Sequence, residues 1–114
     1  GFKRGLPIDA DQVYDLRMLP NPHWDEALRS LSGRDDAVQH FLDAQPQVQQ
    51  MYSDILTYLQ RWLPEIESAG RSYFTIAIGC TGGQHRSVYM AEKLAKALRD
   101  TCPGLQVRHR ELQH

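Results

Sequence analysis

The chain has 114 residues, 41% of them hydrophobic, which suffices for a single domain with one core and is too short for two domains of ordinary size. The 13 Lys and Arg residues nearly balance the 14 Asp and Glu residues, so bulk charge excludes no partner but selects none, and a nucleic-acid face would have to be local. Two cysteines and the lack of a long apolar stretch argue against a disulfide scaffold, a signal peptide and a membrane span. We therefore expect one cytoplasmic domain, and the initial Gly1 in place of Met suggests a piece of a larger soluble protein.

The first predicted element is a strand over residues 13–19. Apolar and polar side chains alternate along it, and several of its residues are of β-favouring types. The cluster Pro20-Asn21-Pro22 that follows cannot continue a strand, because proline lacks the N–H that a sheet requires. We expect the strand to end there in a stiff loop.

Two helices are predicted next. Asp35 or Asp36 can cap a short helix, and a longer helix should begin after Pro46. In both segments apolar residues recur at three- and four-residue spacing, which is typical of a helix with one buried face. Pro64 is expected to kink or shorten the last turns of the longer helix.

The second half of the chain predicts a strand, a helix and a final strand. Residues 73–78 form a nearly continuous apolar run, which indicates a strand covered on both faces. A helical apolar pattern runs from Val88 to Leu98, Pro103-Gly104 should close it, and residues 106–110 favour a last short strand. The order β-α-α-β-α-β predicts a small α/β domain of three-layer type with a mainly parallel sheet, whose strands all end on one side.

The loop at residues 79–87, between the predicted strand and helix, has the composition of an anion-binding site. Gly82 and Gly83 can adopt backbone angles that point successive N–H groups inward, and the following helix adds the positive end of its dipole. Arg86 contributes a fork of donors suited to phosphate. Further donors are expected from Thr81, His85 and Ser87. We predict that this loop holds a phosphorylated small molecule; the alternative is that the glycines only let strand and helix pack closely.

The same loop fits the pattern C-x5-R-[ST] of cysteine-dependent phosphatases, through Cys80, Arg86 and Ser87. In such enzymes a thiolate attacks phosphorus and a separate carboxylic acid protonates the leaving group. The loop acids that could serve are Asp25, Asp35 and Asp36. No pattern in the sequence brings any of them to Cys80, so we expect a binding domain rather than an enzyme, with a buried, apolar Cys80 as a further reading.

His23 and Asn21 lie in the other loop that leaves the carboxyl end of a predicted strand. If the sheet is parallel, both residues approach the glycine loop from the neighbouring strand and can complete a pocket with donors from both sides. A surface histidine without a role is the alternative for His23. His23, His85 and Cys80 lack the paired spacing of a zinc site, so we expect no metal and no cofactor.

Two short basic groups could contact the phosphates of a nucleic acid. They are Lys3 with Arg4, and Arg108 with His109 and Arg110. Short runs of this kind are usually only solvated. The aromatic residues of the long predicted helix, Tyr52, Tyr58 and Trp62, are expected to serve the core or a subunit contact rather than base stacking.

Several longer motifs resemble one known family. Residues 2–7 (FKRGLP) with 9–11 (DAD), residues 15–22 (DLRMLPNP) and residues 77–89 (AIGCTGGQHRSVY) are together similar to the C-terminal domain of the RNase adapter protein RapZ family, in order and over almost the whole chain. Members of that family carry an N-terminal P-loop domain before this one. The P-loop pattern G-x-x-x-x-G-K-[ST] does not occur here, so residues 1–114 correspond to the C-terminal domain alone.

The resemblance implies a sensor and adapter. Family members are thought to bind glucosamine-6-phosphate and a small regulatory RNA and to present the RNA to RNase E, and the domain is said to be similar to a phosphofructokinase subdomain. The sugar-phosphate pocket maps here onto Cys80, Thr81, Gly82, Gly83, His85, Arg86 and His23. This chain departs from well-studied relatives at Gln84, where some have lysine, and at its end, which reads Glu111-Leu112-Gln113-His114 instead of a strongly basic sequence. We predict a homo-oligomeric metabolite-binding and RNA-adapter domain.

Overall fold

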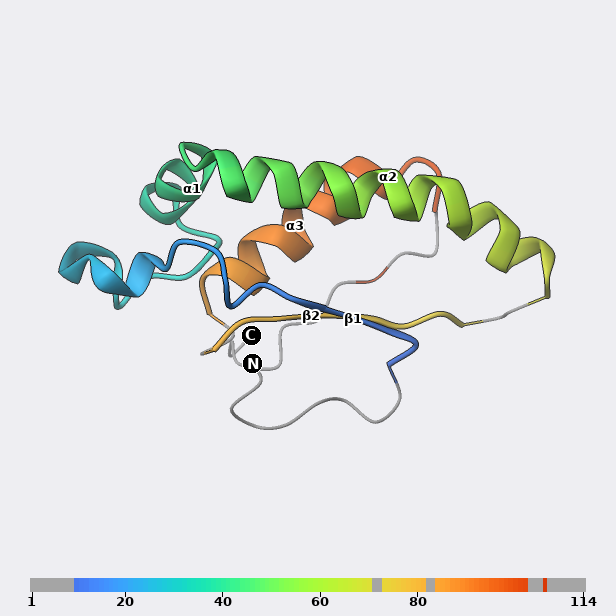
Figure 1. The fold of residues 1–114 in the computed structure, drawn as a ribbon, viewed down its shortest axis with the longest axis horizontal. Coiled ribbons are helices and arrows are strands. Elements are labelled where there is room, and N and C mark those ends of the chain that lie inside the picture. Colours follow the sequence, from blue (N-terminus) through green and yellow to red (C-terminus); the bar gives the residue numbers. More distant parts are fainter. Residues whose placement is uncertain (1–9, 71–72, 82–83, 103–105, 107–114) are drawn as a thin grey trace.

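A computed structural model describes residues 10–70, 73–81, 84–102 and 106. The elements in chain order are β1 (Gln12–Asp15), the short 3₁₀ turns η2 (Pro22–Trp24) and η3 (Glu26–Leu28), α1 (Asp36–Asp43), α2 (Pro46–Ser68), β2 (Ile76–Gly79) and α3 (Arg86–Leu98). The predicted α/β class is confirmed, and so is the order strand, two helices, strand, helix (Figure 1). Of the predicted last strand at 106–110, the structure describes only Gln106, and residues 107–110 lie outside the described part.

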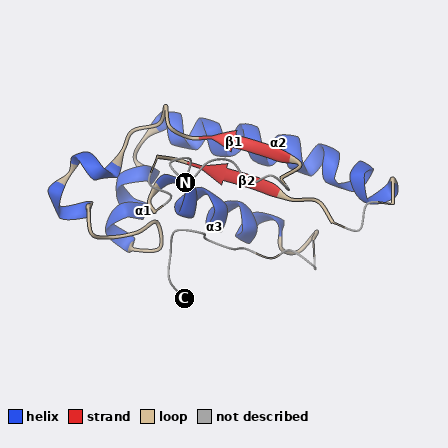
Figure 2. Cartoon of the chain, turned by 90° about the horizontal axis from the view of Figure 1, so that it is seen from below, coloured by secondary structure: helices blue, strands red, loops and turns tan. Residues whose placement is uncertain are grey.

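The described sheet consists of β1 and β2, which pair in parallel with Gln12 opposite Ile76 and Asp15 opposite Gly79. Both strands therefore end on the same side, as predicted (Figure 2). α2 and α3 lie over one face of this sheet (Figure 1). The central part of β2 is only partly buried, so the prediction that its apolar run is covered on both faces is wrong for the described strand.

Both strands differ from the predicted ranges. β1 stops at Asp15 instead of Leu19, because a local turn takes over: the Asp15 carboxylate accepts the Arg17 N–H at 2.9 Å, and the Leu19 N–H donates to the Leu16 carbonyl at 3.1 Å. β2 begins at Ile76 rather than Tyr73, which is highly exposed. The strand pattern in the sequence thus extends beyond the residues that pair.

The predicted helices are present with small changes at their ends. Asp35 occupies the N-cap position of α1, but its carboxylate accepts the Ser32 N–H at 2.7 Å and does not cap the helix. α2 continues for 23 residues through Pro64 to Ser68. Figure 1 shows α2 bending over its last turns, as expected where proline removes a hydrogen-bond donor. None of the helices in the described ranges is long and apolar enough to cross a membrane.

One hydrophobic core lies between the sheet and the helices. Its fully buried side chains come from the three helices and from the residue that follows β1, and include Leu16, Val38, Leu42, Val48, Leu59 and Met90. At its edge Tyr89 donates to the Asp43 carboxylate and accepts from Gln49 and Lys93, which joins α3 to α1 and α2. Burial, followed by the bond to Asp43, raises the pKa of Tyr89 to about 12, so this network keeps a neutral phenol. Tyr58 and Trp62 are each partly exposed and do not belong to the core.

Gly33 brings the segment before α1 directly against the first turn of α3. Its N–H donates to the Gln84 carbonyl at 2.8 Å. A Cβ at this position would lie 2.3 Å from the Tyr89 nitrogen and 2.5 Å from the His85 oxygen. Both are backbone atoms and cannot rotate away, so only glycine permits this close approach.

We therefore expect Gly33→Ala to destabilise the chain by about 2 kcal/mol or more, the cost of overpacking a rigid site. Thermal unfolding followed by circular dichroism measures the change. Ser30→Ala, at an exposed position three residues earlier, serves as the control and should unfold close to the parent. Equal stability of Gly33→Ala and the parent would contradict the close packing.

Candidate functional site

The loops that follow β1 and β2 leave the sheet side by side. Asp15 and Gly79 form the last strand pair, and the Leu16 N–H still donates to the Gly79 carbonyl at 2.8 Å. Beyond this bond one chain turns toward η2 and the other enters the loop before α3. The predicted meeting of the two loops at the carboxyl edge of the sheet is therefore observed.

Arg86 lies at the centre of this junction and is almost completely buried, with only 4% of its surface exposed. Its Nη1 donates to the carbonyls of Leu19, Arg17 and Leu16, at 2.8, 3.0 and 3.3 Å. The buried Nε–H has no hydrogen-bond partner among the described residues. Nη1 of the predicted donor fork is thus directed at the protein's own backbone, and Nε is left without a described partner.

The buried Arg86 cation also lacks a close carboxylate among the described residues. The nearby Asp15 is engaged elsewhere, since its carboxylate pairs with Arg17 at 2.7 Å. Hydrogen bonds from Arg17 hold the pKa of Asp15 below its ordinary value. Arg86 is therefore surrounded by neutral carbonyl dipoles and retains a net positive field at the start of α3.

Cys80 is buried behind the first turn of α3. Its Sγ accepts the Ser87 N–H at 3.4 Å and lies 3.3 Å from the Ser87 hydroxyl. Ser87 is buried as well, whereas Thr81 is exposed at the other end of the loop. Gly82 and Gly83 lie outside the described residues, so the structure does not describe the inward-pointing amides predicted there.

His85 and His23 form a histidine pair at the rim of this junction. His85 is buried, and its Nε2 lies 3.0 Å from the Leu28 carbonyl, an acceptor, so Nε2 carries the proton. Burial is the main cause that lowers the pKa of His85, and the positive charges of His23 and Arg86 act in the same direction. The exposed His23 ring lies 6.4 Å from the His85 ring, between their centroids, and the Asn21 side chain accepts the His23 N–H at 3.0 Å. Asn21 thus holds the turn that carries His23 toward the glycine loop.

Sequence reasoning missed the segment at residues 28–33, which contacts the start of α3. Gly33 and the Leu28 carbonyl both contact the residues that begin α3. Gly33 in Ser32-Gly33-Arg34 could be recognised as a turn glycine, but nothing local indicates that it packs on a helix more than 50 residues later. The backbone carbonyls that surround Arg86 carry no signal in the sequence at all.

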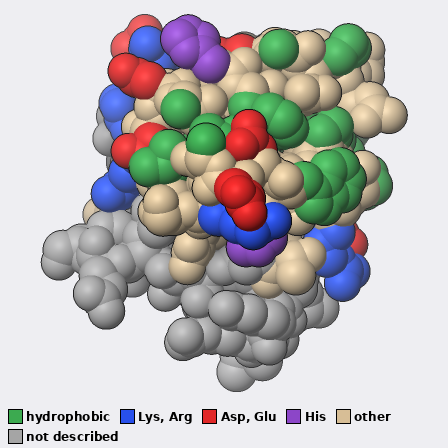
Figure 3. All heavy atoms as spheres, turned by 90° about the vertical axis from the view of Figure 1, so that its left-hand side faces the viewer, with side chains coloured by type: hydrophobic (Ala, Val, Ile, Leu, Met, Phe, Trp, Pro, Cys, Tyr) green, Lys and Arg blue, Asp and Glu red, His purple; other side chains and the backbone are tan. Residues whose placement is uncertain are grey.

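The charged side chains around the site do not form a patch of one sign. Figure 3 views the end of the molecule with α1 and η2, where basic, acidic and histidine side chains are interspersed. The predicted RNA-binding residues, Lys3, Arg4, Arg108, His109 and Arg110, lie outside the described residues. Within the described ranges, no group of three or more metal-ligating side chains is found.

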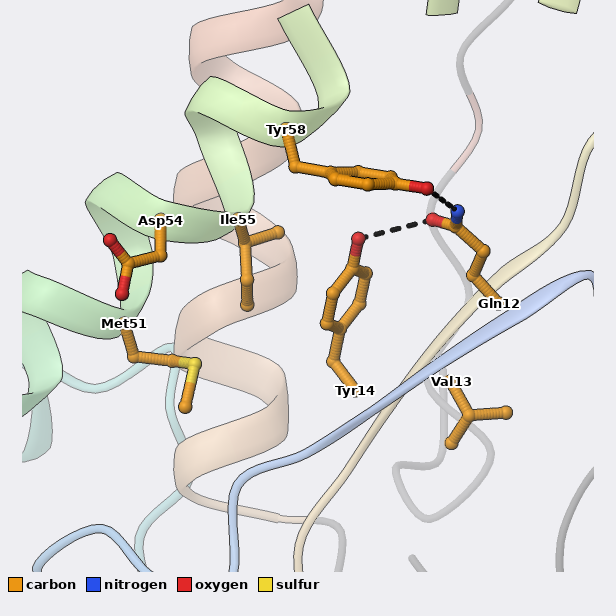
Figure 4. Close-up of a pocket in the computed structure, with 7 residues that line it drawn as sticks. All are labelled: Gln12, Val13, Tyr14, Met51, Asp54, Ile55 and Tyr58. Atoms are coloured by element: carbon orange, nitrogen blue, oxygen red, sulfur yellow. Dashed lines mark hydrogen bonds between the residues drawn. The ribbon is translucent and has the colours of Figure 1, made fainter. Parts of the chain in front are cut away.

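A hollow away from this junction lies between β1 and α2 (Figure 4). Its volume is about 400 Å³, and it is lined by Gln12, Val13, Tyr14, Met51, Asp54, Ile55 and Tyr58. Gln12 donates to the Tyr58 hydroxyl at 2.7 Å and accepts from the Tyr14 hydroxyl at 3.1 Å, which closes its upper wall. The lining contains no predicted site residue, and its one charged side chain is Asp54, so it does not suit an anion.

Comparison with known proteins identifies the family of this chain. The family model of the RapZ C-terminal domain matches residues 1–113. The chain belongs to the RapZ C-terminal domain family. Among curated relatives, proteins named nucleotide-binding protein from Pseudomonas fluorescens, Azotobacter vinelandii and Halorhodospira halophila are 58%, 57% and 54% identical to it. Each match covers 112 residues, 98% of this chain, but the chain spans only 39% of each relative. The resemblance seen in the sequence motifs is thereby confirmed.

The lowered pKa of His85 makes the stability of this RapZ-family domain depend on pH. The folded state holds the imidazole neutral, whereas the unfolded chain takes up a proton below about pH 6.5. The contribution of His85 is therefore complete above about pH 6.5 and is lost as the pH falls below it. We compare melting temperatures at about pH 7.5 and about pH 5.5, one unit above and one unit below the ordinary pKa of histidine. Between these two pH values, the melting temperature of His85→Gln, which can still donate to Leu28, should fall less than that of the parent.

The control for this comparison is His40→Gln, at an exposed position of α1. It removes a histidine without touching the junction and should keep the pH slope of the parent. Parallel slopes for His85→Gln and the parent would contradict the buried, neutral state of His85.

Proposed function

We propose that this chain is a non-catalytic sensor and adapter domain. It binds an amino-sugar phosphate of the glucosamine-6-phosphate type where β2 passes into α3, and it binds a small regulatory RNA for presentation to RNase E. The observation that carries the proposal is the buried Arg86, a cation with an unused Nε–H beside a helix N-terminus. The membership in the RapZ C-terminal domain family supports the adapter role.

The energetics of Arg86 favour an anion at this point. A buried donor without a partner costs about 1–3 kcal/mol, and a hydrogen bond to a charged group contributes about 1.5–3 kcal/mol. A phosphate oxygen that accepts from Nε would remove the first cost and add the second contribution. The 13-residue helix α3 adds the positive end of its dipole at the same place.

The rim of the site supports a sugar phosphate over a bare phosphate ion. Thr81, His23 and Asn21 carry hydroxyl, imidazole and amide groups of the kind that bind sugar hydroxyls. The relatives' name refers to nucleotides, but the P-loop motif for nucleotide phosphates does not occur in this segment, which spans 39% of those proteins. We therefore place nucleotide binding outside this chain and the sugar phosphate within it.

The phosphatase alternative needs a general acid, and the candidate aspartates are engaged in local hydrogen bonds or begin a helix. The Asp25 carboxylate accepts the Ala27 N–H at 3.0 Å, and the Asp35 carboxylate accepts the Ser32 N–H, so both side chains hold local turns. Asp36 begins α1. Cleavage of a phosphate ester by a cysteine needs a general acid near its sulfur, and two of these three candidates hold local turns instead.

A melting experiment tests the sugar-phosphate site. A ligand that binds only the folded chain at a hundredfold excess over its Kd stabilises it by about 2.7 kcal/mol, so we expect an upward shift of several degrees with glucosamine-6-phosphate. Glucosamine without the phosphate should give no comparable shift. Arg86→Ala should abolish the shift, while Arg61→Ala, an exposed arginine of α2, should retain it.

Two outcomes would overturn this part of the proposal. The first is a parent protein whose melting temperature is indifferent to sugar phosphates and to inorganic phosphate. The second is steady release of phosphate from an aryl phosphate by the parent that is lost in Cys80→Ser, because this would make the chain a phosphatase.

Binding to a structured small RNA tests the adapter role. Contacts between cationic side chains and phosphates make affinity fall steeply with salt. We expect the double variant Arg108→Ala, Arg110→Ala to bind more weakly and to lower the salt slope by about two, one for each lost phosphate contact. Lys96→Ala with Arg99→Ala, which removes two exposed charges near the end of α3, is the matched control. Equal losses in both double variants would leave the predicted RNA residues without a specific role.

A further inference from the structure

A single nitrogen of Arg86 organises the turn that follows β1. Three carbonyl oxygens, those of Leu16, Arg17 and Leu19, converge on Nη1 within 2.8–3.3 Å, although they lie 67 to 70 residues earlier in the chain. A guanidinium nitrogen of this kind carries two hydrogens, so three acceptors share them. The turn is thus wrapped around the cation, and without Arg86 its carbonyl dipoles would repel one another.

The turn is connected to His23 by a stiff segment. Pro20 and Pro22 have fixed φ angles, and the Asn21 side chain accepts the His23 N–H. Arg29 Nε donates to the His23 carbonyl at 2.7 Å and holds the far end of the same segment. Few torsions remain free between Leu19 and His23, so a displacement of the turn moves the His23 ring relative to His85.

From this geometry we propose that Arg86 is a positioning residue as well as a ligand contact. Its Nη1 fixes the turn Leu16–Leu19 and, through it, the place of His23 at the rim of the site. The donors of Arg86 that the turn does not use, among them the Nε–H without a described partner, are those that the ligand uses. The second part rests on the proposed sugar-phosphate function, whereas the first concerns the unliganded chain.

Arg86→Lys separates the two tasks. The ammonium group has three hydrogens for the three carbonyls and keeps the positive charge, but it offers no planar fork with a second donor direction. Arg86→Ala removes both. Arg17→Ala is the matched control, because it removes an exposed guanidinium of the same turn whose described partner is Asp15.

Amide hydrogen exchange measures the positioning task in the chain without ligand. In Arg86→Ala we expect exchange in residues 16–24 to become about tenfold faster or more, while exchange in α2 changes by about twofold or less. Arg86→Lys should stay within about threefold of the parent in both segments, and Arg17→Ala within about twofold. A general loss of stability would accelerate both segments together, so the contrast between them identifies a local role.

Affinity for glucosamine-6-phosphate, measured by calorimetry, tests the ligand contact. We expect Arg86→Lys to bind about tenfold more weakly or worse despite its intact turn. Parental affinity of Arg86→Lys would overturn the assignment of Nε. Unchanged exchange in residues 16–24 of Arg86→Ala, or equal acceleration of that segment and of α2, would overturn the positioning role. If Arg86→Ala does not fold, Arg86→Met, which fills similar space without a donor, takes its place in the comparison with Arg86→Lys. A parent that binds no sugar phosphate would sink the proposed function and leave the exchange result standing.

Discussion

The buried guanidinium of Arg86 is the interaction on which the described architecture of the site depends. It lies at the first position of α3 and bonds to the backbone that follows β1, so it connects the helix to the far strand of the sheet. A buried cation is costly unless its hydrogen bonds are made, and here neutral carbonyls make only part of them. The fold therefore retains a buried donor without a described partner at the point where the two loops meet.

The elements that the sequence predicts well are those specified by local patterns. The apolar spacing of Val48, Ile55 and Leu59 alone indicates α2, and all three residues are buried in one face of that helix. Helices on both sides of residues 76–79 likewise require a crossover connection, from which parallel pairing follows. The glycine loop at the N-terminus of α3 could be located for the same reason, since strand, loop and helix are contiguous in the chain.

What the sequence did not predict depends on contacts between distant residues. The strand pattern through Leu19 is real, but β1 ends at Asp15 because the following carbonyls turn toward Arg86. Arg86 has the residue type of a phosphate ligand, and no local pattern shows that three backbone oxygens share its Nη1. Gly33 is similar: its role against His85 and Tyr89 becomes visible only when α3 lies beside it. Contacts between distant residues thus determine where β1 ends and which acceptors Arg86 binds.

The two proposed roles of Arg86 have a consequence for how the proposed sensor would work. A ligand that binds only to preformed amides would leave the rest of the domain unchanged, whereas a ligand that binds the guanidinium through its other donors also acts on the turn that Nη1 holds. The turn held by Arg86 contains Met18, which is 63% exposed, and leads on to Trp24, which is 74% exposed. Both residues belong to the segment 16–24, whose position Arg86 controls on our proposal. On our proposal, a ligand that shifts Arg86 would therefore move exposed side chains through a single turn of backbone.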